Sequence, residues 1–312
     1  MCETIPPKGK PAWLKKPLPQ GGDYQRVKQL LSNARLTTVC QEANCPNMFE
    51  CFSKNTSTFM ILGSECTRHC RFCNITANPP MPVDPDEPKR VAETARKLGL
   101  TYVVVTSVTR DDLPDGGAGH FAAVIKTIKQ SQPLPKTSNH TMGHNEENQE
   151  IKVEVLIPDF QSDIKALKTV VYAKPDVINH NIETVASLYE TVRPEANYLR
   201  SLDLLRNVKA MEPLMPVKSG IMVGLGETDE ELTQTMEDLF EHGCDILTIG
   251  QYLQPTRQHL KVIKYYSPEE FEILAKTARK IGIPRVASGP FVRSSYNAQE
   301  LFNIFPSGYR RC

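Results

Sequence analysis

The chain contains 312 residues, of which 40% are hydrophobic and 23% are charged, a composition typical of a globular protein with one large domain or two smaller ones. Its formal net charge of +1 gives no sign of a nucleic-acid-binding surface or a polybasic membrane anchor. No window approaches the roughly 18 consecutive apolar residues of a membrane span, and the first thirty residues lack the apolar segment of a secretory signal. The sequence therefore predicts a cytoplasmic protein that binds neither nucleic acid nor membranes.

The predicted elements begin with a Pro-rich, mostly extended leader within residues 1–30 and a short helix over Tyr24–Ser32. Further along, apolar strands alternate with amphipathic helices. The predicted strands are Thr58–Leu62, Tyr102–Thr106, Val153–Ile157, Asp176–Asn179, Gly220–Gly224, Ile246–Ile249 and, as a possible seventh, Arg285–Ala287. The predicted helices are Lys89–Leu98, Phe121–Lys129, Ile164–Val171, Leu199–Met211, Glu230–His242 and Pro268–Lys280.

This alternation is typical of repeated βαβ units around a parallel sheet. About six units are too few for a closed eight-stranded barrel, so the sequence predicts an α/β fold of the partial (β/α)6 TIM type. We expect an N-terminal extension over 1–56, the partial barrel over 57–288 and a C-terminal extension over 289–312. The polar segment 130–149 has almost no apolar residue to bury, which predicts a flexible insertion.

Six of the nine cysteines lie between residues 40 and 73, in two triplets of different spacing. The triplets are Cys40-x4-Cys45-x5-Cys51 and Cys66-x3-Cys70-x2-Cys73. Three thiolates can hold three irons of a 4Fe–4S cube and leave the fourth iron open to another ligand. A zinc site usually draws on two pairs of ligands, and a ferredoxin-like carrier would hold all four irons with cysteine. The triplets therefore predict two 4Fe–4S clusters, each with one position not filled by cysteine.

The second triplet directly follows the first predicted strand and Gly63, and Phe72 precedes its last cysteine. This spacing and context resemble the radical S-adenosylmethionine (SAM) superfamily. The resemblance implies that the open iron binds SAM as a co-substrate, and that electron transfer from the cluster cleaves SAM to a 5′-deoxyadenosyl radical. It also implies that Phe72 lies alongside the adenine, with packing in the core as the alternative.

Two segments at predicted strand ends are candidate SAM contacts. Gly220-x-Met222-x-Gly224-x-x-Glu227 resembles the superfamily's motif beside the adenine, where glycine allows close backbone approach, although a strand that ends in a tight turn would show the same pattern. The segment 106–112 supplies hydroxyl, carboxylate and guanidinium groups suited to the charged ends of SAM. Its candidates are Thr106, Ser107 and Asp111, and Asp111 could instead cap the short segment before Gly116-Gly117.

Three further polar residues, Glu154, Asn179 and Arg193, fall at or after predicted strand ends. Each either orients SAM or the substrate lysine, or makes a structural hydrogen bond or salt bridge. His180 is predicted to form a hydrogen bond in the core, with catalysis as the alternative. Arg68 and His69 are expected to support the site or to lie on the surface, and not to bind iron.

The first triplet, placed ahead of the second, resembles the pattern of the lipoyl synthase family, and shared motifs extend along nearly the whole chain. These motifs are Lys10–Lys15, Glu42–Asn47, Thr106–Leu113, Asp115–Ala118, Glu154–Phe160, Asn179–Thr184, Val192–Pro194, Gln251–Arg257 and Arg293–Tyr296.

That resemblance implies that Cys40, Cys45 and Cys51 hold an auxiliary 4Fe–4S cluster, with Ser295 of the Arg293–Tyr296 motif as its fourth ligand. Serine suits a cluster that is consumed, because an alkoxide holds iron less durably than a thiolate in a sulfur-rich cluster. Taken alone, a Ser294-Ser295 pair would predict the N-cap of a helix that begins near Tyr296.

The implied reaction is a sulfur transfer at C6 and C8 of an octanoyl chain that is amide-linked to a lysine, with the auxiliary cluster as sulfur donor. The implied partners are octanoylated lipoyl carrier domains, namely E2 subunits of 2-oxoacid dehydrogenases and the glycine cleavage H protein. The resemblance also implies an electron donor such as ferredoxin or flavodoxin, and an iron–sulfur carrier that rebuilds the cluster. The alternatives are another radical SAM enzyme such as a methylthiotransferase, and a non-enzymatic iron–sulfur or zinc module.

Overall fold

The computed structural model describes residues 9–15, 23–43, 45–53, 57–131 and 150–303. Most of the predicted insertion, residues 132–149, and the last part of the predicted C-terminal extension, residues 304–312, lie outside the described residues. Within the described ranges, none of the helices combines the length and the apolarity that crossing a membrane requires.

Eight strands form the main sheet, in the order β1-β2-β5-β6-β7-β8-β9-β10. Their bounds are β1 Thr37–Thr38, β2 Thr58–Ile61, β5 Tyr102–Ser107, β6 Lys152–Leu156, β7 Val177–Asn179, β8 Val217–Val223, β9 Ile246–Gln251 and β10 Arg285–Gly289. β1 runs antiparallel to β2, and all other neighbours are parallel. β3 (Glu65–Cys66) and β4 (Thr76–Ala77) form a separate parallel pair.

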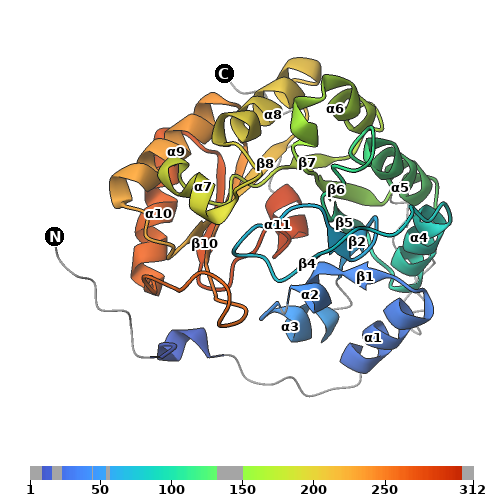
Figure 1. Ribbon diagram of the computed structural model, residues 1–312, viewed down its shortest axis with the longest axis horizontal. Helices are drawn as coiled ribbons and strands as arrows, with labels where there is room; N and C mark the ends of the chain where they lie inside the picture. The colour runs from blue at the N-terminus through green and yellow to red at the C-terminus, as the bar shows by residue number, and fades with distance from the viewer. Residues whose placement is uncertain (1–8, 16–22, 44, 54–56, 132–149, 304–312) are drawn as a thin grey trace, which may run out of the picture.

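The main sheet curves into an open ring with helices around its outer face (Figure 1). β1 and β10 form its two edges, and no ladder between described residues joins them. The predicted partial barrel is therefore confirmed, and so is its seventh parallel strand, β10. The strands of such a sheet are covered on both faces, which explains why all four residues of β2 are buried.

The helices predicted between the strands are confirmed to within three residues at each end. The α-helices are α1 Asp23–Asn33, α2 Val39–Glu42, α3 Met48–Ser53, α4 Glu87–Lys97, α5 Ala118–Gln130, α6 Ile164–Val171, α7 Tyr189–Val192, α8 Tyr198–Met211, α9 Asp229–Glu241, α10 Pro268–Ile281 and α11 Ala298–Asn303. Three 3-10 turns are η1 Ala12–Leu14, η2 Phe160–Ser162 and η3 Ala186–Leu188. α9 and α10 begin with capping boxes, in which the N-cap and third helical residues satisfy each other's backbone N–H groups.

The last helix, α11, packs on the concave face of the sheet. Val103 and Val105 of β5 belong to the core shared with the outer helices, whereas Tyr102 and Val104 contact α11. Successive side chains of a strand point to opposite faces, so α11 lies opposite the outer helices, and Figure 1 shows it inside the ring. Arg285 Nη1 also donates to Leu301 O over 3.1 Å.

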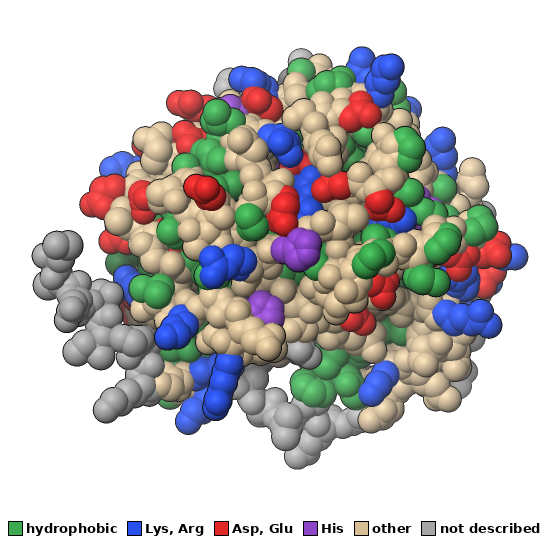
Figure 2. All heavy atoms as spheres, viewed as in Figure 1, with side chains coloured by type: hydrophobic (Ala, Val, Ile, Leu, Met, Phe, Trp, Pro, Cys, Tyr) green, Lys and Arg blue, Asp and Glu red, His purple; other side chains and the backbone are tan. Residues whose placement is uncertain are grey.

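The contacts of α11 place it at the amino ends of the strands. Its Leu301 and Phe302 pack with Val177 and Ile246, the first residues of β7 and β9. The interior of the barrel is therefore filled at that end. On the outer surface of the molecule, basic and acidic side chains are interspersed over the face shown in Figure 2, in keeping with the net charge of +1.

Candidate active site

The second cysteine triplet lies on the loop after β2, at the carboxyl end of the sheet. The chain turns out of β2 through Leu62 and Gly63, which both have positive φ angles, of 68° and 97°. Thr67 N donates to Thr109 O over 3.1 Å, and Thr109 N donates to Cys66 Sγ over 3.3 Å. The cysteine loop is thus joined to the segment that follows β5, as expected for a site at the strand ends.

The thiols of this triplet lie close enough to influence one another electrostatically. Burial raises the pKa of Cys70 and raises that of Cys73 to about 12; Cys66 adds to both shifts, and Cys70 adds to that of Cys73. In the described part of the chain, no three acidic, histidine or cysteine side chains converge as a single metal ion would require. In a 4Fe–4S cube each thiolate binds its own iron, so three neighbouring thiols that do not converge on one point fit the cube.

Six buried polar atoms have no hydrogen-bond partner among the described residues. Ser57 Oγ precedes β2, and the other five lie at the ends of β5 and β7 or after β7, namely Ser107 Oγ, Asn179 Oδ1, Asn181 Oδ1, Thr184 Oγ1 and Arg193 Nε. Such atoms are rare in native proteins, and several together indicate the position of a polar ligand. They include donors and acceptors from the ends of β5 and β7 and from the segment after β7, which fits the amino and carboxylate groups of SAM.

Arg193 lies beside the cysteine loop. Its Nη1 donates to Tyr189 Oη over 2.9 Å and to Asn181 O over 3.1 Å, and its guanidinium stands 5.4 Å from the centre of the Tyr189 ring. Burial dominates the raised pKa of Cys70, and Arg193 opposes that shift, so the positive charge reaches the cluster loop. The predicted contact of Arg193 with SAM stays a prediction, supported by its place and its unpartnered Nε.

Glu154 and Asn179 both face the interior of the barrel, in a buried network. The Glu154 carboxylate accepts hydrogen bonds from Lys218 Nζ (2.8 Å), Tyr102 Oη (2.7 Å) and Asn179 Nδ2 (3.3 Å). Lys218 and Glu154 have 0% exposure. These contacts are the structural salt bridge and hydrogen bonds that were the alternative to a SAM contact for Glu154. Asn179 Oδ1 has no partner among the described residues and stays available to a ligand.

The segment after β5 is held by contacts with the cysteine loop and by hydrogen bonds within the segment. Asp111 binds Arg68 through both carboxylate oxygens, at 2.6 and 2.9 Å. The alternative that Asp111 caps the next segment is wrong, because Asp115 accepts from Gly117 N (2.9 Å) and Gly119 N (2.8 Å) instead. Thr106 Oγ1 donates to Leu156 O over 3.0 Å, which leaves Ser107 as the hydroxyl of the pair without a partner in the described ranges.

Gly224 ends β8 in a tight turn with a φ of 105°. An added Cβ would overlap Gln251 and the carbonyl oxygen of Lys264, so this turn requires glycine. The Glu227 carboxylate accepts from Gly224 N (2.5 Å) and Leu225 N (2.8 Å). The tight-turn alternative thus accounts for the spacing of this motif, and its contact with adenine stays a prediction.

Phe72 packs against the same end of the barrel. It joins an apolar cluster built on Val192, Leu225, Tyr252 and Val262. The packing alternative for Phe72 is therefore confirmed, and its place alongside the adenine stays a prediction.

The first triplet forms a compact turn. Cys40 lies in α2, Cys51 lies in α3, and Cys45 N donates to Cys40 O over 3.1 Å. Thr38 caps α2 by accepting from Gln41 N over 3.3 Å. Burial raises the pKa of Cys40 to about 12, and Cys45 and Cys51 add to the shift, so these three thiols also lie close together.

The C-terminal motif lies beside the first triplet, although more than 240 residues separate them. Asn47 Nδ2 donates to Phe291 O over 2.6 Å, and Tyr296 Oη donates to Glu50 Oε1 over 3.2 Å. Burial lowers the pKa of Arg293, and the charge of Cys45 opposes that shift, which places Arg293 near this triplet.

Within this motif the two serines differ. Ser294 Oγ accepts from Asn181 Nδ2 over 2.6 Å, so it is engaged by the segment after β7. The N-cap alternative is wrong, because α11 begins at Ala298 and its N-cap position is Asn297. Ser295 is half-buried, and its assignment as the fourth ligand of the auxiliary cluster is compatible with these contacts.

Three residues that matter for this arrangement were not predicted from the sequence, namely Asp159, Asn181 and Lys218, and Arg68 was expected only to support the site or to lie on the surface. Asp159 and Asn181 occur within motifs shared with the lipoyl synthase family, and that was their only signal. As predicted, His180 is buried with two hydrogen bonds, to Ile157 O (2.8 Å) and Ser201 Oγ (3.0 Å).

We expect His180 to make the stability of the fold depend on pH. Burial lowers the pKa of His180 to about 4, so the folded state prefers the neutral ring, whereas an unfolded chain takes up a proton near pH 6.5. The contribution is complete above pH 6.5 and is lost as the pH falls toward 4, with roughly 2 kcal/mol lost by pH 5. Anaerobic urea unfolding at pH 7.5 and pH 5 should show this loss in the original protein and a much smaller one in His180→Gln. An equal loss in both would contradict the assignment.

Comparisons with known proteins agree with this geometry. A sequence profile of the radical SAM superfamily matches residues 60–239, and a profile of the N-terminal domain of lipoyl synthase of the radical SAM family matches residues 7–45. Lipoyl synthase of Caldanaerobacter subterraneus subsp. tengcongensis is 54% identical over 289 residues, which cover 93% of this chain and 95% of that protein. Lipoyl synthase of Alkaliphilus metalliredigens is 53% identical over 293 residues, covering 94% and 96%.

Solved structures support the fold. SuiB of Streptococcus suis, bound to the precursor peptide SuiA, matches with a TM-score of 0.55 at 11% identity, over 85% of this chain and 52% of that chain. HydG, a hydrogenase maturase, matches with a TM-score of 0.53 at 16% identity, over 85% and 67%. The methylthiotransferase alternative gains no support from the sequence relatives, which carry the lipoyl synthase name. With relatives more than 50% identical over more than nine-tenths of both chains, this chain belongs to the lipoyl synthase family of radical SAM enzymes, which use SAM and 4Fe–4S clusters.

Proposed function

We propose that this chain inserts sulfur at C6 and C8 of a protein-bound N6-octanoyl-lysine and so produces N6-lipoyl-lysine. The observation that carries the proposal is the pair of thiol triplets in unequal surroundings. One triplet faces unpartnered polar atoms at the strand ends, and the other lies against the serine-containing segment 293–296. When bound, the two clusters supply the electron that cleaves SAM and the sulfur that enters the product.

The protein's own residues divide the SAM site into a charged part and an apolar part. Ser107, Asn179 and Arg193 present the unpartnered atoms that would hold the amino and carboxylate groups of SAM. Phe72 and its apolar cluster, next to the turn at Gly224, would form the apolar side that holds the adenine. Unactivated C–H bonds lack acidity, so general-base chemistry cannot break them, and this division instead serves to orient SAM beside Cys66, Cys70 and Cys73.

The auxiliary site consists of Cys40, Cys45 and Cys51 with Ser295. Asn47 and Glu50 tie the cysteine segment to the serine segment through their contacts with Phe291 and Tyr296. These contacts hold the two segments together while leaving the Ser295 side chain to bind iron. A ligand on a separate segment can leave its iron without disturbing the three thiolates.

The substrate would be presented by a lipoyl carrier protein, either an E2 subunit or the glycine cleavage H protein. Ferredoxin or flavodoxin as electron donor, an iron–sulfur carrier that rebuilds the auxiliary cluster, and the cytoplasmic location remain predictions of the sequence. Because α11 fills the amino end of the barrel, the octanoyl chain would enter at the carboxyl ends of the strands.

Anaerobic turnover of an octanoyl-lysine peptide with SAM and a strong reductant tests the proposed function. We expect 5′-deoxyadenosine and a peptide whose mass has increased by two sulfur atoms in place of two hydrogens. Deoxyadenosine without any sulfur in the peptide would require the substrate assignment to be abandoned. Metal analysis that finds stoichiometric zinc and no sulfide would contradict the iron–sulfur assignment itself.

We expect Ser295→Cys to slow sulfur insertion by about tenfold or more, a barrier increase of at least roughly 1.4 kcal/mol. A thiolate holds iron more firmly than an alkoxide, so the auxiliary iron would be released less readily. Deoxyadenosine formation should continue, and single-turnover product should fall in mass spectrometry. Ser294→Cys is the matched control for the neighbouring position. A loss in Ser294→Cys with normal insertion in Ser295→Cys would move the ligand to Ser294.

A further inference from the structure

Arg68 is a buried cation inside the loop that carries the second triplet. Its side chain is 4% exposed, although it lies between two cysteines of a loop. Nε and Nη2 donate to the two oxygens of Asp111 (2.6 and 2.9 Å), while Nη1 and Nη2 donate to the two oxygens of Asp159 (3.0 and 2.6 Å). One guanidinium therefore binds two carboxylates, each through both of its oxygens.

The two carboxylates come from neighbouring strands. Asp111 follows β5 and Asp159 follows β6, and these strands pair in parallel. Arg68 thus connects the cysteine loop to the carboxyl ends of two strands at once. Asp111 N also donates to Thr67 Oγ1 over 3.1 Å, so the residue before Arg68 is joined to the segment after β5 as well.

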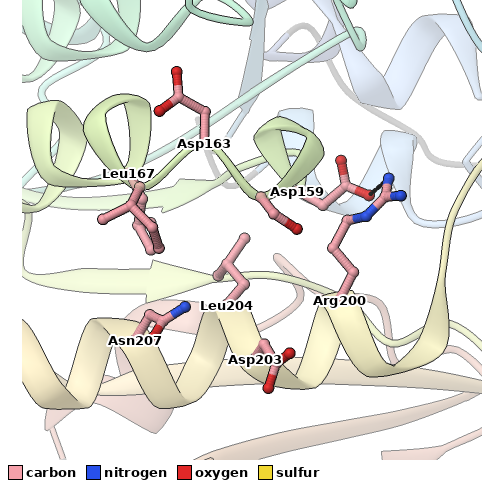
Figure 3. A pocket seen from close by; sticks show the side chains of 9 residues that line it. Asp159, Asp163, Leu167, Arg200, Asp203, Leu204 and Asn207 are labelled. Atoms are coloured by element: carbon pink, nitrogen blue, oxygen red, sulfur yellow. Dashed lines mark hydrogen bonds and ion pairs between the residues drawn. The ribbon is translucent and has the colours of Figure 1, made fainter.

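A second arginine balances the charges. Arg200 in the first turn of α8 donates from Nη1 to Asp159 Oδ2 over 3.3 Å, and Figure 3 shows its side chain directed toward Asp159 at the edge of a small pocket. Two arginines thus face two carboxylates. Burial favours the protonated acid, yet the Arg68 guanidinium holds the pKa of Asp159 well below its usual range, so the carboxylate stays charged. A buried charge is tolerated only when it is paired in this way.

We propose that Arg68 is a positioning residue for radical formation, because it fixes the cysteine loop against β5 and β6 and so sets where the SAM-binding iron stands relative to the strand ends. This inference rests on the proposed function. Arginine is required because its planar group offers donors in a fixed fork, whereas lysine is a point charge that cannot bind both carboxylates bidentately.

The next residue in the same loop shows the contrast. The His69 side chain is 69% exposed and contacts Glu195, itself 37% exposed, at 3.0 Å. His69 lies in the same loop as Arg68, but its side chain contacts Glu195, in the segment after α7, at the surface. A contact of this kind adds little to stability in water. His69 is therefore a matched control.

The test compares Arg68→Lys with His69→Ala in the cluster-loaded enzyme. For Arg68→Lys we expect iron content to be retained and SAM-dependent deoxyadenosine formation to fall by about 10- to 100-fold, the usual range for residues that orient metal ligands. The change that SAM causes in the electron paramagnetic resonance spectrum of the reduced cluster should also be weakened. His69→Ala should match the original enzyme in both measurements.

Both readouts are taken without octanoyl substrate, so they stand even where sulfur insertion is not observed. The inference is overturned if Arg68→Lys shows the same SAM-induced spectral change and the same rate of deoxyadenosine formation as the original enzyme. If Arg68→Lys does not fold or load iron, Asp159→Asn decides, because it keeps Arg68 and Asp111, weakens one side of the clamp and removes no candidate SAM contact. A weakened SAM response in Asp159→Asn supports the inference, and an unchanged response overturns it.

Discussion

Replacing Cys70 with alanine should abolish SAM cleavage, whereas replacing Cys45 with alanine should abolish sulfur insertion and leave SAM cleavage intact. The reason is that the two triplets lie in different parts of the molecule. One is on the loop after β2, and the other lies in α2, in α3 and in the turn that joins them. Each variant should lose one 4Fe–4S site and keep about four irons, because the other three thiols are untouched. Iron analysis, deoxyadenosine formation and the mass of an octanoyl-lysine peptide measure the three outcomes separately.

Cys244→Ala provides the control for loss of a thiol outside both triplets. Cys244 is fully buried, and its Sγ donates to Ile246 O over 3.2 Å. This variant should keep about eight irons and both activities, with at most a modest loss of stability. Loss of both activities in Cys45→Ala, with both sets of irons gone, would mean that the two sites are not independent.

The second large effect is expected from the buried Lys218–Glu154 pair. Lys218→Met should lower the free energy of unfolding by about 3–5 kcal/mol, because it leaves the Glu154 carboxylate buried without its cation. The double variant Lys218→Met with Glu154→Gln should recover most of the loss. An amide at position 154 carries no charge, and its one oxygen can still accept from Asn179 Nδ2 while its NH2 group can donate to Tyr102 Oη. Urea unfolding of four proteins, the original, Lys218→Met, Glu154→Gln and the double variant, measures the coupling between the two positions.

An exposed pair serves as the reference for this experiment. Lys276 and Glu272 lie one turn apart on α10, with their charged atoms 3.9 Å apart and their side chains 71% and 72% exposed. Lys276→Met should change the free energy of unfolding by less than about 0.5 kcal/mol. Equal effects of Lys218→Met and Lys276→Met would show that burial of the first pair does not matter.

The regular part of the fold was predictable because it repeats a simple pattern. Apolar strands and amphipathic helices of ordinary length alternate, and their periodicity indicates each element without knowledge of its neighbours. Short helices such as α2, α3 and α11 contain only four to six residues, too few for a helical period to be recognised. β8 was predicted to begin at Gly220 but begins at Val217, since Lys218 and Ser219 are polar residues that the interior accepts through specific partners.

The candidate site was predictable where its residues are adjacent in sequence. Each triplet is visible as a spacing, whereas the link between the first triplet and the 293–296 segment followed only from resemblance to a family. Arg68 illustrates the remaining limit. An arginine in a polar loop is usually exposed, and only the folded chain brings Asp111 and Asp159 to it from two strands.

The position of α11 inside the ring has a consequence for how the protein is made. The three cysteines of the auxiliary site leave the ribosome early, while the segment that carries Ser295 is among the last described parts to be synthesised. That segment passes along the concave face, where an added Cβ at Gly250 would overlap Val292 O, and α11 then packs on the first residues of β7 and β9. α11 can pack there only after β7 and β9 have both paired with β8, which lies between them. Completion of the auxiliary site by serine would therefore report that the whole barrel has folded, and a truncated or misfolded chain would keep three thiols without their fourth partner.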